Sequence, residues 1–493
     1  MVSKAVDVDG KPYNRVMLIV ILLIGVFCTV LNQTILTTAF PALMDAFDIS
    51  TSTVQWLTTG FLMVNGVMIP VSAYLSNKFA TKWLYIVAMA IFELGTVISW
   101  VAPSFAVLLT GRLIQALGVG IAMPLLQTIM LTIFPKEKRG TAMEMAGLVV
   151  GLAPALGPTL SGWIIDHFSW RDLFGMIVPI MAVVLIGSLF FMKNVIKTSN
   201  PSLDFWSLVL STAGFGSMLY GFSTVGDNGW TDPVVISTIV IGVVLVILFV
   251  IRQLKIKDPF VEVRVFKSKA FSIATILSSI VMMAMVGVSM VVPLYLQIVH
   301  GMSAFKSGLT MLPGAIIMGV MSPITGTLFD KYGARRLAMC GLFILTFGTL
   351  PFVYLSRNTP SIYIVFLYSI RMFGISMVTM PVTTYGMNAL PANMIADGTA
   401  ANNTIRQVAT SVGTALLVSV LTNVTNNHLP AKSLLKQAPF EYKVRAINAT
   451  MNGYQAAFWI AVAFCILEFV VSFLLPAHSQ TSHEMADQGG DQA

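Results

Sequence analysis

Three of the ionisable side chains that lie inside long apolar runs of this sequence suggest proton transfer within a membrane. They are Glu93, Arg112 and Arg371. A charge at the centre of a bilayer costs about 2.5–3.5 kcal/mol even on the most lenient scale. A carboxyl group with no cation nearby can avoid this cost by binding a proton, and can release it again. A guanidinium keeps its proton, so it must face a partner, water or a polar interior.

Two of these residues also have structural alternatives. Glu93 could be a permanently protonated, hydrogen-bonded residue with a packing role. Arg371 could instead tie backbone carbonyl groups together. The sequence leaves both alternatives open.

Long apolar segments must position these side chains. The chain has 493 residues, of which 56% are hydrophobic and only 10% charged, and its mean hydropathy is +0.83. Soluble domains carry about 25% charged residues. Apolar stretches of about 20 residues recur along nearly the whole chain, and each is long enough to cross a bilayer as a helix. The sequence therefore predicts an all-α polytopic membrane protein with 14 transmembrane helices, the last two at 400–422 and 455–475.

The basic residues set the expected orientation. With the N-terminus in the cytoplasm, most Lys and Arg fall on inner segments, which is the usual orientation signal. Both termini are then cytoplasmic, and the net charge of +8 needs no nucleic acid to explain it. One segment departs from the rule, because Lys432, Lys436, Lys443 and Arg445 lie between the last two spans, on the outer side. Long loops follow the rule weakly, so the 14-span prediction stands.

A short basic loop occurs twice. Residues 326–336 match a worn copy at 73–83, which lies 253 positions earlier, and Arg112 and Arg371 are separated by a similar 259 positions. Two landmarks at nearly the same offset indicate an internal duplication. The sequence then predicts two pseudo-symmetric six-helix bundles, at 1–192 and 271–476, with an inserted two-helix hairpin at 193–252. The linker 253–270 is expected to be a solvated amphipathic cytoplasmic segment, and 477–493 a polar tail.

Three motifs resemble those of the major facilitator superfamily. Residues 326–336 are similar to its inner-loop signature, Gly-x-Leu-x-Asp-Arg/Lys-x-Gly-x-Arg/Lys-Arg/Lys. The pattern Arg-x-x-Gln-x-x-Gly-x-Gly at 112–120 resembles its second motif, and 153–162 resembles the Gly-x-x-x-Gly-Pro-x-x-Gly-Gly motif of drug:proton antiporters. With 14 spans, the resemblance over 13–476 is to the multidrug efflux branch.

This resemblance implies a place in proton transfer for Arg112, which with Glu93 and Asn32 makes up the expected proton-coupling set. The branch usually has an aspartate in a Leu-Asp-x-Thr-Ile pattern of span 1, where this chain has Asn32. An asparagine carries no proton, so either Glu93 has taken over the titration or the coupling differs. The last span is peripheral in this fold, so a packing role is expected for Glu468.

Span 5 contains the residues of the antiporter-type motif. Each proline there removes a backbone donor, and the small residues allow a neighbouring helix to approach closely. The resemblance implies a bend that seals one face of the protein while the other opens; a merely kinked and packed helix is the alternative. The residues are Pro154, Gly157, Pro158 and Gly162.

The repeated loops are expected to act as gates, each docking on the inner start of a helix in the opposite half. Asp330 is expected beside Gly140 and Thr141, where the helix dipole favours an anion. Lys331 or Arg335 is then expected to reach a glutamate.

In the worn copy, Lys78 or Lys82 is expected to pair with Asp397. The glutamates within reach of the other loop are Glu137 and Glu144. The complete gating set is Gly326, Asp330, Lys331, Gly333, Arg335, Arg336, Asn77, Lys78, Glu144 and Asp397.

The substrate cavity is expected to be apolar and adaptable. The chain has 30 Met and 31 Phe residues, and polarizable unbranched side chains suit a promiscuous pocket. A methionine stripe is nevertheless more often ordinary packing. The cavity candidates are Gln115, Gln127, Met285, Met290, Arg371, Met377, Asn388 and Asn403.

The expected function is export of hydrophobic or cationic compounds in exchange for protons, by alternating access in a bacterial plasma membrane. Export of an endogenous lipid or cell-wall precursor is the alternative, and a nutrient symporter is less favoured. No nucleotide-binding loop, catalytic triad or metal-ligand spacing occurs, so neither an enzyme nor a cofactor is expected. The expected partners are small substrates, protons and the bilayer, with the protein acting as a monomer.

Overall fold

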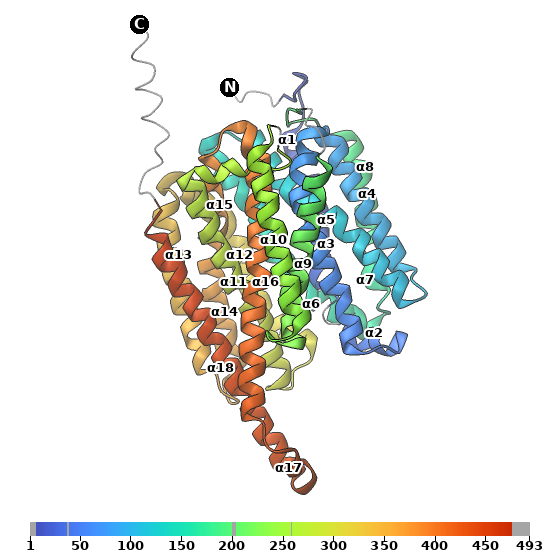
Figure 1. The fold of residues 1–493 in the computed structure, drawn as a ribbon, viewed down its shortest axis with the longest axis vertical. Helices are drawn as coiled ribbons and strands as arrows, with labels where there is room; N and C mark the ends of the chain where they lie inside the picture. The colour runs from blue at the N-terminus through green and yellow to red at the C-terminus, as the bar shows by residue number, and fades with distance from the viewer. Residues whose placement is uncertain (1–5, 37–38, 200–203, 258, 476–493) are drawn as a thin grey trace.

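The computed structural model describes residues 6–36, 39–199, 204–257 and 259–475, which are helical almost throughout (Figure 1). Within these ranges there is no β-strand, and β pairing is limited to one bridge between Val6 and Pro12. Fourteen of the helical segments described are long and apolar enough to cross a membrane. The predicted all-α fold with 14 spans is confirmed. The expected polar tail, 477–493, lies outside the described residues.

The first bundle packs six long helical segments around an apolar core. Leu22, Tyr85, Phe92 and Leu126 are fully buried there. The helices are α1 Arg15–Thr34, α2 Phe40–Phe47, α3 Thr51–Lys78, α4 Thr81–Trp100, α5 Phe105–Ile133, η1 Lys136–Lys138, α6 Arg139–His167, α7 Asp172–Gly175 and α8 Ile177–Phe191.

The second bundle repeats this plan. Its core contains the buried residues Leu277, Tyr295, Leu345 and Phe458. Its helices are α11 Lys269–Ile298, α12 Ala304–Tyr332, α13 Ala334–Thr349, η3 Leu350–Tyr354, α14 Ser361–Ser376, α15 Thr379–Asn388, η4 Ala392–Met394, α16 Ile395–His428, α17 Lys432–Gln437 and α18 Pro439–Ser472.

The two bundles meet along two helix pairs. α6 packs against α12, and α3 packs against α16. The chain starts α1 and finishes α18 at the same end of the molecule (Figure 1), which we name the terminal end; the opposite end is the far end. Since successive spans alternate in direction, α6 and α16 begin at the terminal end, and α3 and α12 finish there.

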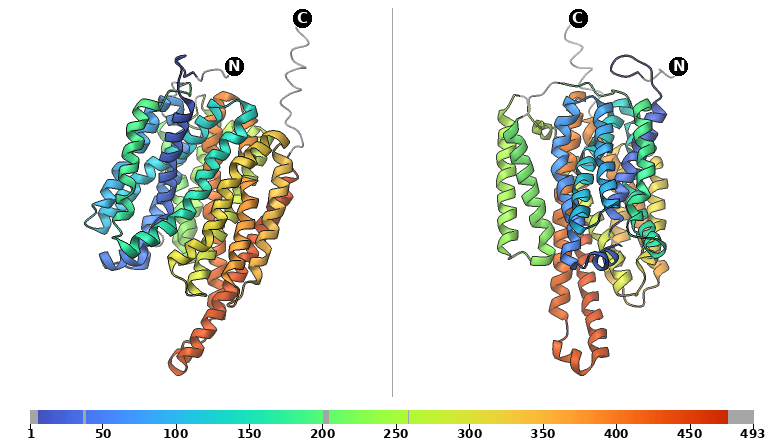
Figure 2. Two further views of the ribbon diagram at one scale, coloured as in Figure 1. Left: turned by 180° about the vertical axis from the view of Figure 1, so that it is seen from behind. Right: turned by 90° about the vertical axis from the view of Figure 1, so that its right-hand side faces the viewer.

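An extra helix pair lies beside the bundles (Figure 2, right). It consists of α9 Phe205–Asn228 and α10 Pro233–Lys255, and the Asp232 side chain caps α10 by accepting from the backbone of Val234 and Val235. α9 packs on α3 and α16, whereas α10 packs mainly on α9. Only 17% of the most apolar stretch of α10 is buried inside the protein. The limits of the two bundles, hairpin and linker remain predictions.

An ion pair closes the hairpin at the terminal end. Both guanidinium donors Nε and Nη2 of Arg252 reach Asp204, at 2.6 and 2.7 Å. These hydrogen bonds lower the pKa of Asp204 to about 2. Because its pKa in the folded protein lies below the ordinary value of about 3.9, the pair contributes stability above that value and loses it as the pH falls toward 2. The pair is thus intact throughout the physiological range.

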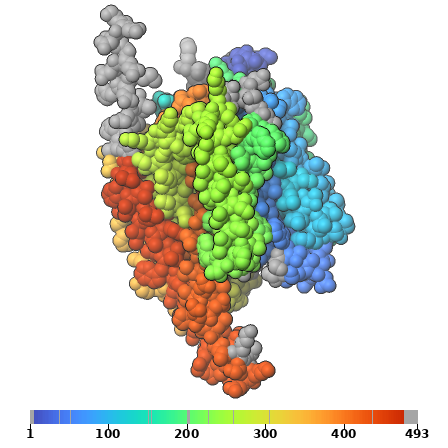
Figure 3. All heavy atoms as spheres, viewed as in Figure 1, coloured from blue at the N-terminus to red at the C-terminus, as the bar shows by residue number. Residues whose placement is uncertain are grey.

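The segment between the last two spans differs from the expected loop. α16 and α18 continue well beyond the bundle and, with α17, form a helical hairpin that projects from the far end (Figures 2 and 3). Glu441 and Arg445 form an i,i+4 ion pair on it at 2.5 Å. The expectation of spans 400–422 and 455–475 was too short, because hydropathy reports where apolar residues end and a helix continues past that point.

The linker also differs from expectation. The short helix η2 Val263–Lys267 and the residues before it pack onto the bundles, with Phe260, Val261 and Val265 almost completely buried. The ring of Phe260 stacks on that of Tyr74 in α3, with centroids 5.6 Å apart. The linker was expected to be solvated and amphipathic, but these apolar side chains are covered by the protein itself.

Candidate functional site

Asp330, at the last turn of α12, touches the first turn of α6 in the opposite half. Its carboxylate accepts from the backbone N–H groups of Gly140 at 2.9 Å and Thr141 at 3.0 Å, and from the Thr141 hydroxyl at 2.7 Å. The first N–H groups of a helix have no partner within it, and the helix dipole favours an anion there. The expected contact is therefore present and joins the two halves at the terminal end.

Small residues let α12 come this close. A β-carbon on Gly326 would lie 2.7 Å from the Cα of Thr141, so only glycine fits. Gly333 follows α12 with φ +79°, a backbone conformation that favours glycine. The sequence motif is thus explained by packing and by a helix end.

The basic residues of this loop do not behave as expected. Among the described residues, neither Lys331 nor Arg335 forms an ion pair, and the Lys331 ammonium lies 5.2 Å from the ring centroid of Tyr332. Arg336 is exposed. Glu144 is buried between α6 and α12, against Gly326, so its carboxyl group is turned away from the surface where the cations lie. The expected pairing of Lys331 or Arg335 with Glu144 was wrong for this reason, and among the described residues exposed Glu137 forms no ion pair with either cation.

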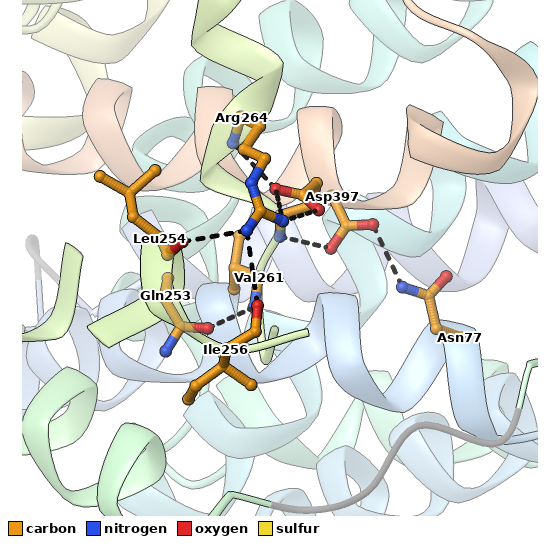
Figure 4. Close-up of polar contacts among 8 residues, drawn as sticks. Asn77, Gln253, Leu254, Ile256, Val261, Arg264 and Asp397 are labelled. Carbon is orange, nitrogen blue, oxygen red and sulfur yellow. Dashed lines mark hydrogen bonds and ion pairs between the residues drawn. The ribbon is translucent and has the colours of Figure 1, made fainter. Parts of the chain in front are cut away.

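The worn loop makes a different contact with the other half (Figure 4). The amide Nδ2 of Asn77, at the end of α3, donates to Asp397 in the first turn of α16 at 3.2 Å. Lys78 instead donates to the Tyr74 hydroxyl at 2.6 Å, and Lys82 to the Leu189 carbonyl at 2.6 Å. The expected pairing of a lysine with Asp397 was wrong, because both ammonium groups have nearer partners in their own half.

The linker shares this second contact. The backbone N–H of Glu262 donates to the other oxygen of Asp397 at 3.0 Å, so one carboxylate holds both α3 and the linker (Figure 4). The Gln253 side chain accepts from the backbone of Val261 at 3.2 Å. Sequence reasoning missed these residues, although the apolar positions among the polar ones were a signal that this segment docks.

Arg264 joins the linker to the end of α10. Its guanidinium donates to Glu262 at 3.0 Å and to the carbonyl of Leu254, at the end of α10, at 3.0 Å. The inserted hairpin is therefore connected through a folded linker to the contact between Asn77 and Asp397.

Two further polar contacts join the two halves in the part of the protein toward the terminal end. Asn403 of α16 donates to Gln127 of α5 at 2.7 Å, and Arg139 donates to Asn388 of α15 at 3.0 Å. Three of these residues were cavity candidates. The structure places them in direct contact with the other half.

Arg112 is completely buried at the centre of the first bundle. Its guanidinium donates to the carbonyl of Leu57 on α3 at 3.4 Å, to the carbonyl and side-chain oxygens of Asn32 on α1, and to Gln115 at 2.9 Å. The ring of Phe61 lies 4.2 Å from the guanidinium carbon, a cation–π distance. Arg112 and Asn32, predicted together, are thus in contact, and Gln115 belongs to this cluster.

Glu93 is not part of that cluster. It is half-buried on α4, one of its carboxylate oxygens has no hydrogen-bond partner in the described part of the chain, and no hydrogen bond or ion pair there joins it to Arg112. Its assignment to proton coupling stays a prediction.

The remaining candidates are dispersed. Met290 is 43% exposed on the outside of α11, Met285 packs partly buried in the second core, Met377 lies near Phe329, and Arg371 is buried inside the second bundle. These residues are not brought together into one pocket.

The antiporter-type segment lies within α6, which is one continuous helix. A β-carbon on Gly157 would meet Thr34 of α1, and one on Gly162 would lie 3.2 Å from Phe305 of α12. Pro158 is partly buried, whereas the side chain of Pro154 lies outside what the structure describes. Close helix approach is present, and the bend remains a prediction.

Residues 22–414 match the family description Major Facilitator Superfamily. The chain belongs to the major facilitator superfamily. Two curated relatives in the superfamily come from Bacillus subtilis (strain 168). The uncharacterized MFS-type transporter YcnB is 47% identical over 95% of this chain and 97% of its own length, and the lincomycin resistance protein LmrB is 38% identical over 96% and 98%. With 14 spans, the chain falls in the drug-efflux branch of the superfamily.

A solved member of the superfamily confirms the fold. The human organic anion transporter MFSD10 (TETRAN) aligns with a TM-score of 0.66 at 13% identity, over 92% of this chain and 99% of its own. At this identity the likeness concerns architecture alone.

The contact between Asp330 and the start of α6 can be tested by a substitution at Gly140. A β-carbon on Gly140 would collide with the side chains of Phe329 and Asp330. We expect Gly140→Ala to lower transport about tenfold while the protein still inserts and folds, because the backbone donors are pushed away from the carboxylate. Gly319→Ala on α12 is the matched control, since its β-carbon would meet only Leu148 at 4.0 Å. Equal transport by the two variants would contradict a role for the contact between Asp330 and the start of α6.

Proposed function

We propose that this protein exports small hydrophobic or cationic compounds across a bacterial plasma membrane in exchange for protons, by alternating access. The observation that carries the proposal is the docking of Asp330 on the start of α6, which ties the two bundles together at the terminal end. A transporter must break such contacts to open that end. The relationship to a lincomycin resistance protein supports export of drug-like compounds.

The same proposal states which end of the protein faces the cytoplasm and which parts of it move as units. The terminal end faces the cytoplasm, because most basic residues lie there, and the projecting hairpin of α16, α17 and α18 faces outward. Two bundles, 1–192 and 271–476, rock against each other around the central site in a protein that works as a monomer. The inserted hairpin, 193–252, and the linker, 253–270, follow this movement.

In the first half, we assign proton coupling to Arg112 and Asn32, which are in contact at the bundle centre. We also assign it to Glu93, which lies in the same bundle. The gate residues at the two loops would hold the inner side closed while the substrate leaves outward. Gln127, Asn388 and Asn403 would separate when that side opens, which exposes polar groups to an entering substrate.

Export of an endogenous lipid or cell-wall precursor is a second candidate. It is favoured by an apolar groove of about 410 Å³ between the first bundle and the inserted hairpin, whose walls include Met63, Met68, Val71, Leu117 and Leu208. Acyl chains fit a groove of this chemistry.

Transport into inverted membrane vesicles tests the proposal. We expect uptake of ethidium or lincomycin when the vesicle interior is acidified, and loss of uptake when a protonophore collapses the gradient. A fluorescent phospholipid in the same assay tests the second candidate. Uptake that requires ATP and ignores the gradient would refute proton exchange.

A further inference from the structure

The second bundle contains a buried arginine that occupies the same place as Arg112 in the first. Arg371 donates through Nη2 to the carbonyl of Ala284 on α11 at 2.5 Å, as Arg112 donates to the carbonyl of Asn32 on α1. Its Nε donates to the hydroxyl of Thr349 at 3.1 Å, and Thr349 follows Thr96 at the same spacing as the two loops. The duplication has therefore preserved the backbone anchor of each arginine.

The side-chain partners of the two arginines differ. In the first bundle, Asn32 and Gln115 supply oxygen atoms to Arg112. In the second bundle, Ala284 offers its carbonyl as Asn32 does, and Gly374 lies at the position that matches Gln115, but neither has a side-chain oxygen. A side chain at 374 would also lie 2.8 Å from the backbone oxygen of Gly341 on α13, so a partner from that position has no room. Within the described part of the chain, the Nη1 of Arg371 has no hydrogen-bond partner, as the Nη2 of Arg112 has none.

The peripheral helix α18 brings an acid to this place. Glu468 is completely buried, and within the described residues neither of its carboxyl oxygens has a hydrogen-bond partner. It is near enough to Arg371 for the two to interact electrostatically. Cys465, one turn earlier, donates to the same Thr349 hydroxyl that accepts from Arg371, at 3.7 Å, which fixes this face of α18 toward the arginine.

An unpaired buried carboxylate is costly, and a neutral carboxyl group much less so. Glu468 without a hydrogen-bond donor is therefore protonated in this conformation. The other titratable side chains around the pair are Tyr368 and Cys465, which are neutral hydroxyl and thiol groups. Arg371 is thus the group that can stabilise the ionised form of Glu468, once a shift of α18 on the helices it packs against, α11, α13 and α16, brings the two side chains into contact.

We propose that Glu468 and Arg371 form a second proton-binding site in the second bundle, in which Glu468 carries a proton in the present conformation and releases it on pairing with Arg371. The O–H bond of the carboxyl group breaks, the proton passes to water, and the carboxylate pairs with a guanidinium whose charge is unchanged. The inference rests on the proposed function, because it names a residue that carries the exchanged proton. It reverses the expectation that Glu468 only packs, and it gives the second bundle the acid that Arg112 lacks.

Proteoliposomes containing the whole protein and a pH-sensitive dye test this site, with ethidium and lincomycin as probes. We expect Glu468→Gln to lower gradient-driven uptake and probe-induced proton movement at least tenfold while probe exchange across the membrane, without a gradient, stays within twofold of wild type. Glu441→Gln, at an exposed position of the same helix, is the matched control and is expected to leave both unchanged.

Glu468→Asp keeps a carboxyl group and is expected to restore coupling with a shifted pH profile, which a purely structural role would not produce. It also serves as the test if the glutamine variant does not fold. Coupled uptake by Glu468→Gln with the wild-type pH profile would overturn the site and leave the proposed function intact. Absence of proton movement in the wild-type protein would overturn both.

Discussion

Replacing Asp330 with asparagine is expected to remove most of the export activity. The substitution keeps one oxygen but turns an amide N–H₂ toward donors from Gly140 and Thr141, and it removes the negative charge at the start of α6. Hydrogen bonds to charged groups contribute about 1.5–3 kcal/mol each. A loss of about 2 kcal/mol lowers the relative population of the state closed at the terminal end roughly 30-fold. Initial rates of ethidium uptake into inverted vesicles measure the effect.

Asn77→Ala provides the comparison within the same fold. It removes a single hydrogen bond of 3.2 Å, and Asp397 keeps its bond from the backbone of Glu262. We therefore expect a loss of about twofold to threefold, well below that of Asp330→Asn. Asp45→Asn, at an exposed position of α2, controls for loss of an acid and is expected to have no effect. Similar losses from Asp330→Asn and Asn77→Ala would disprove the ranking of the two contacts.

Arg112→Lys is expected to reduce gradient-driven transport roughly 100-fold, although the positive charge remains. The planar guanidinium reaches α1 and α3 at once, through Asn32 and Leu57, and also binds Gln115 on its own helix. An ammonium group is a point charge on a flexible stem and does not reproduce this fork. Its loss leaves buried oxygen atoms unpaired, at about 1–3 kcal/mol each.

Uptake assays on purified, reconstituted protein measure the rate, and thermal unfolding monitored by size exclusion measures stability separately. Arg357→Lys, at an exposed loop position, is the control and is expected to behave as wild type. Wild-type uptake by Arg112→Lys would show that the positive charge alone is sufficient there.

The sequence predicted those features that depend on position along a helix. The duplication placed Asp330 opposite the start of α6, and the helix dipole explained why an acid belongs there. Span number followed from the lengths of the apolar runs. Arg112 and Asn32 were both assigned to proton coupling from the resemblance to the superfamily, and the contact between them came only from the structure.

What the sequence could not supply was the direction in which each side chain points. Glu93 and Glu468 both lie inside apolar runs, and Glu468 was expected only to pack because the last span is peripheral in this fold. In the folded protein, Glu468 is the one beside an arginine, because the rotation of α18 turns it inward. Lys78 was likewise within reach of Asp397 in sequence terms, but the Tyr74 hydroxyl lies one helical turn away and binds it first.

The exposed surface of α10 has a consequence for the surroundings of the protein. Its 23 residues span about 35 Å at 1.5 Å per residue, slightly more than the roughly 30 Å thickness of a hydrocarbon core. Such a helix adjusts its tilt when bilayer thickness changes. The end of α10 is bound through Arg264 and Glu262 to Asp397. We therefore expect the length of the surrounding acyl chains to influence the contact that holds α3 and α16 together.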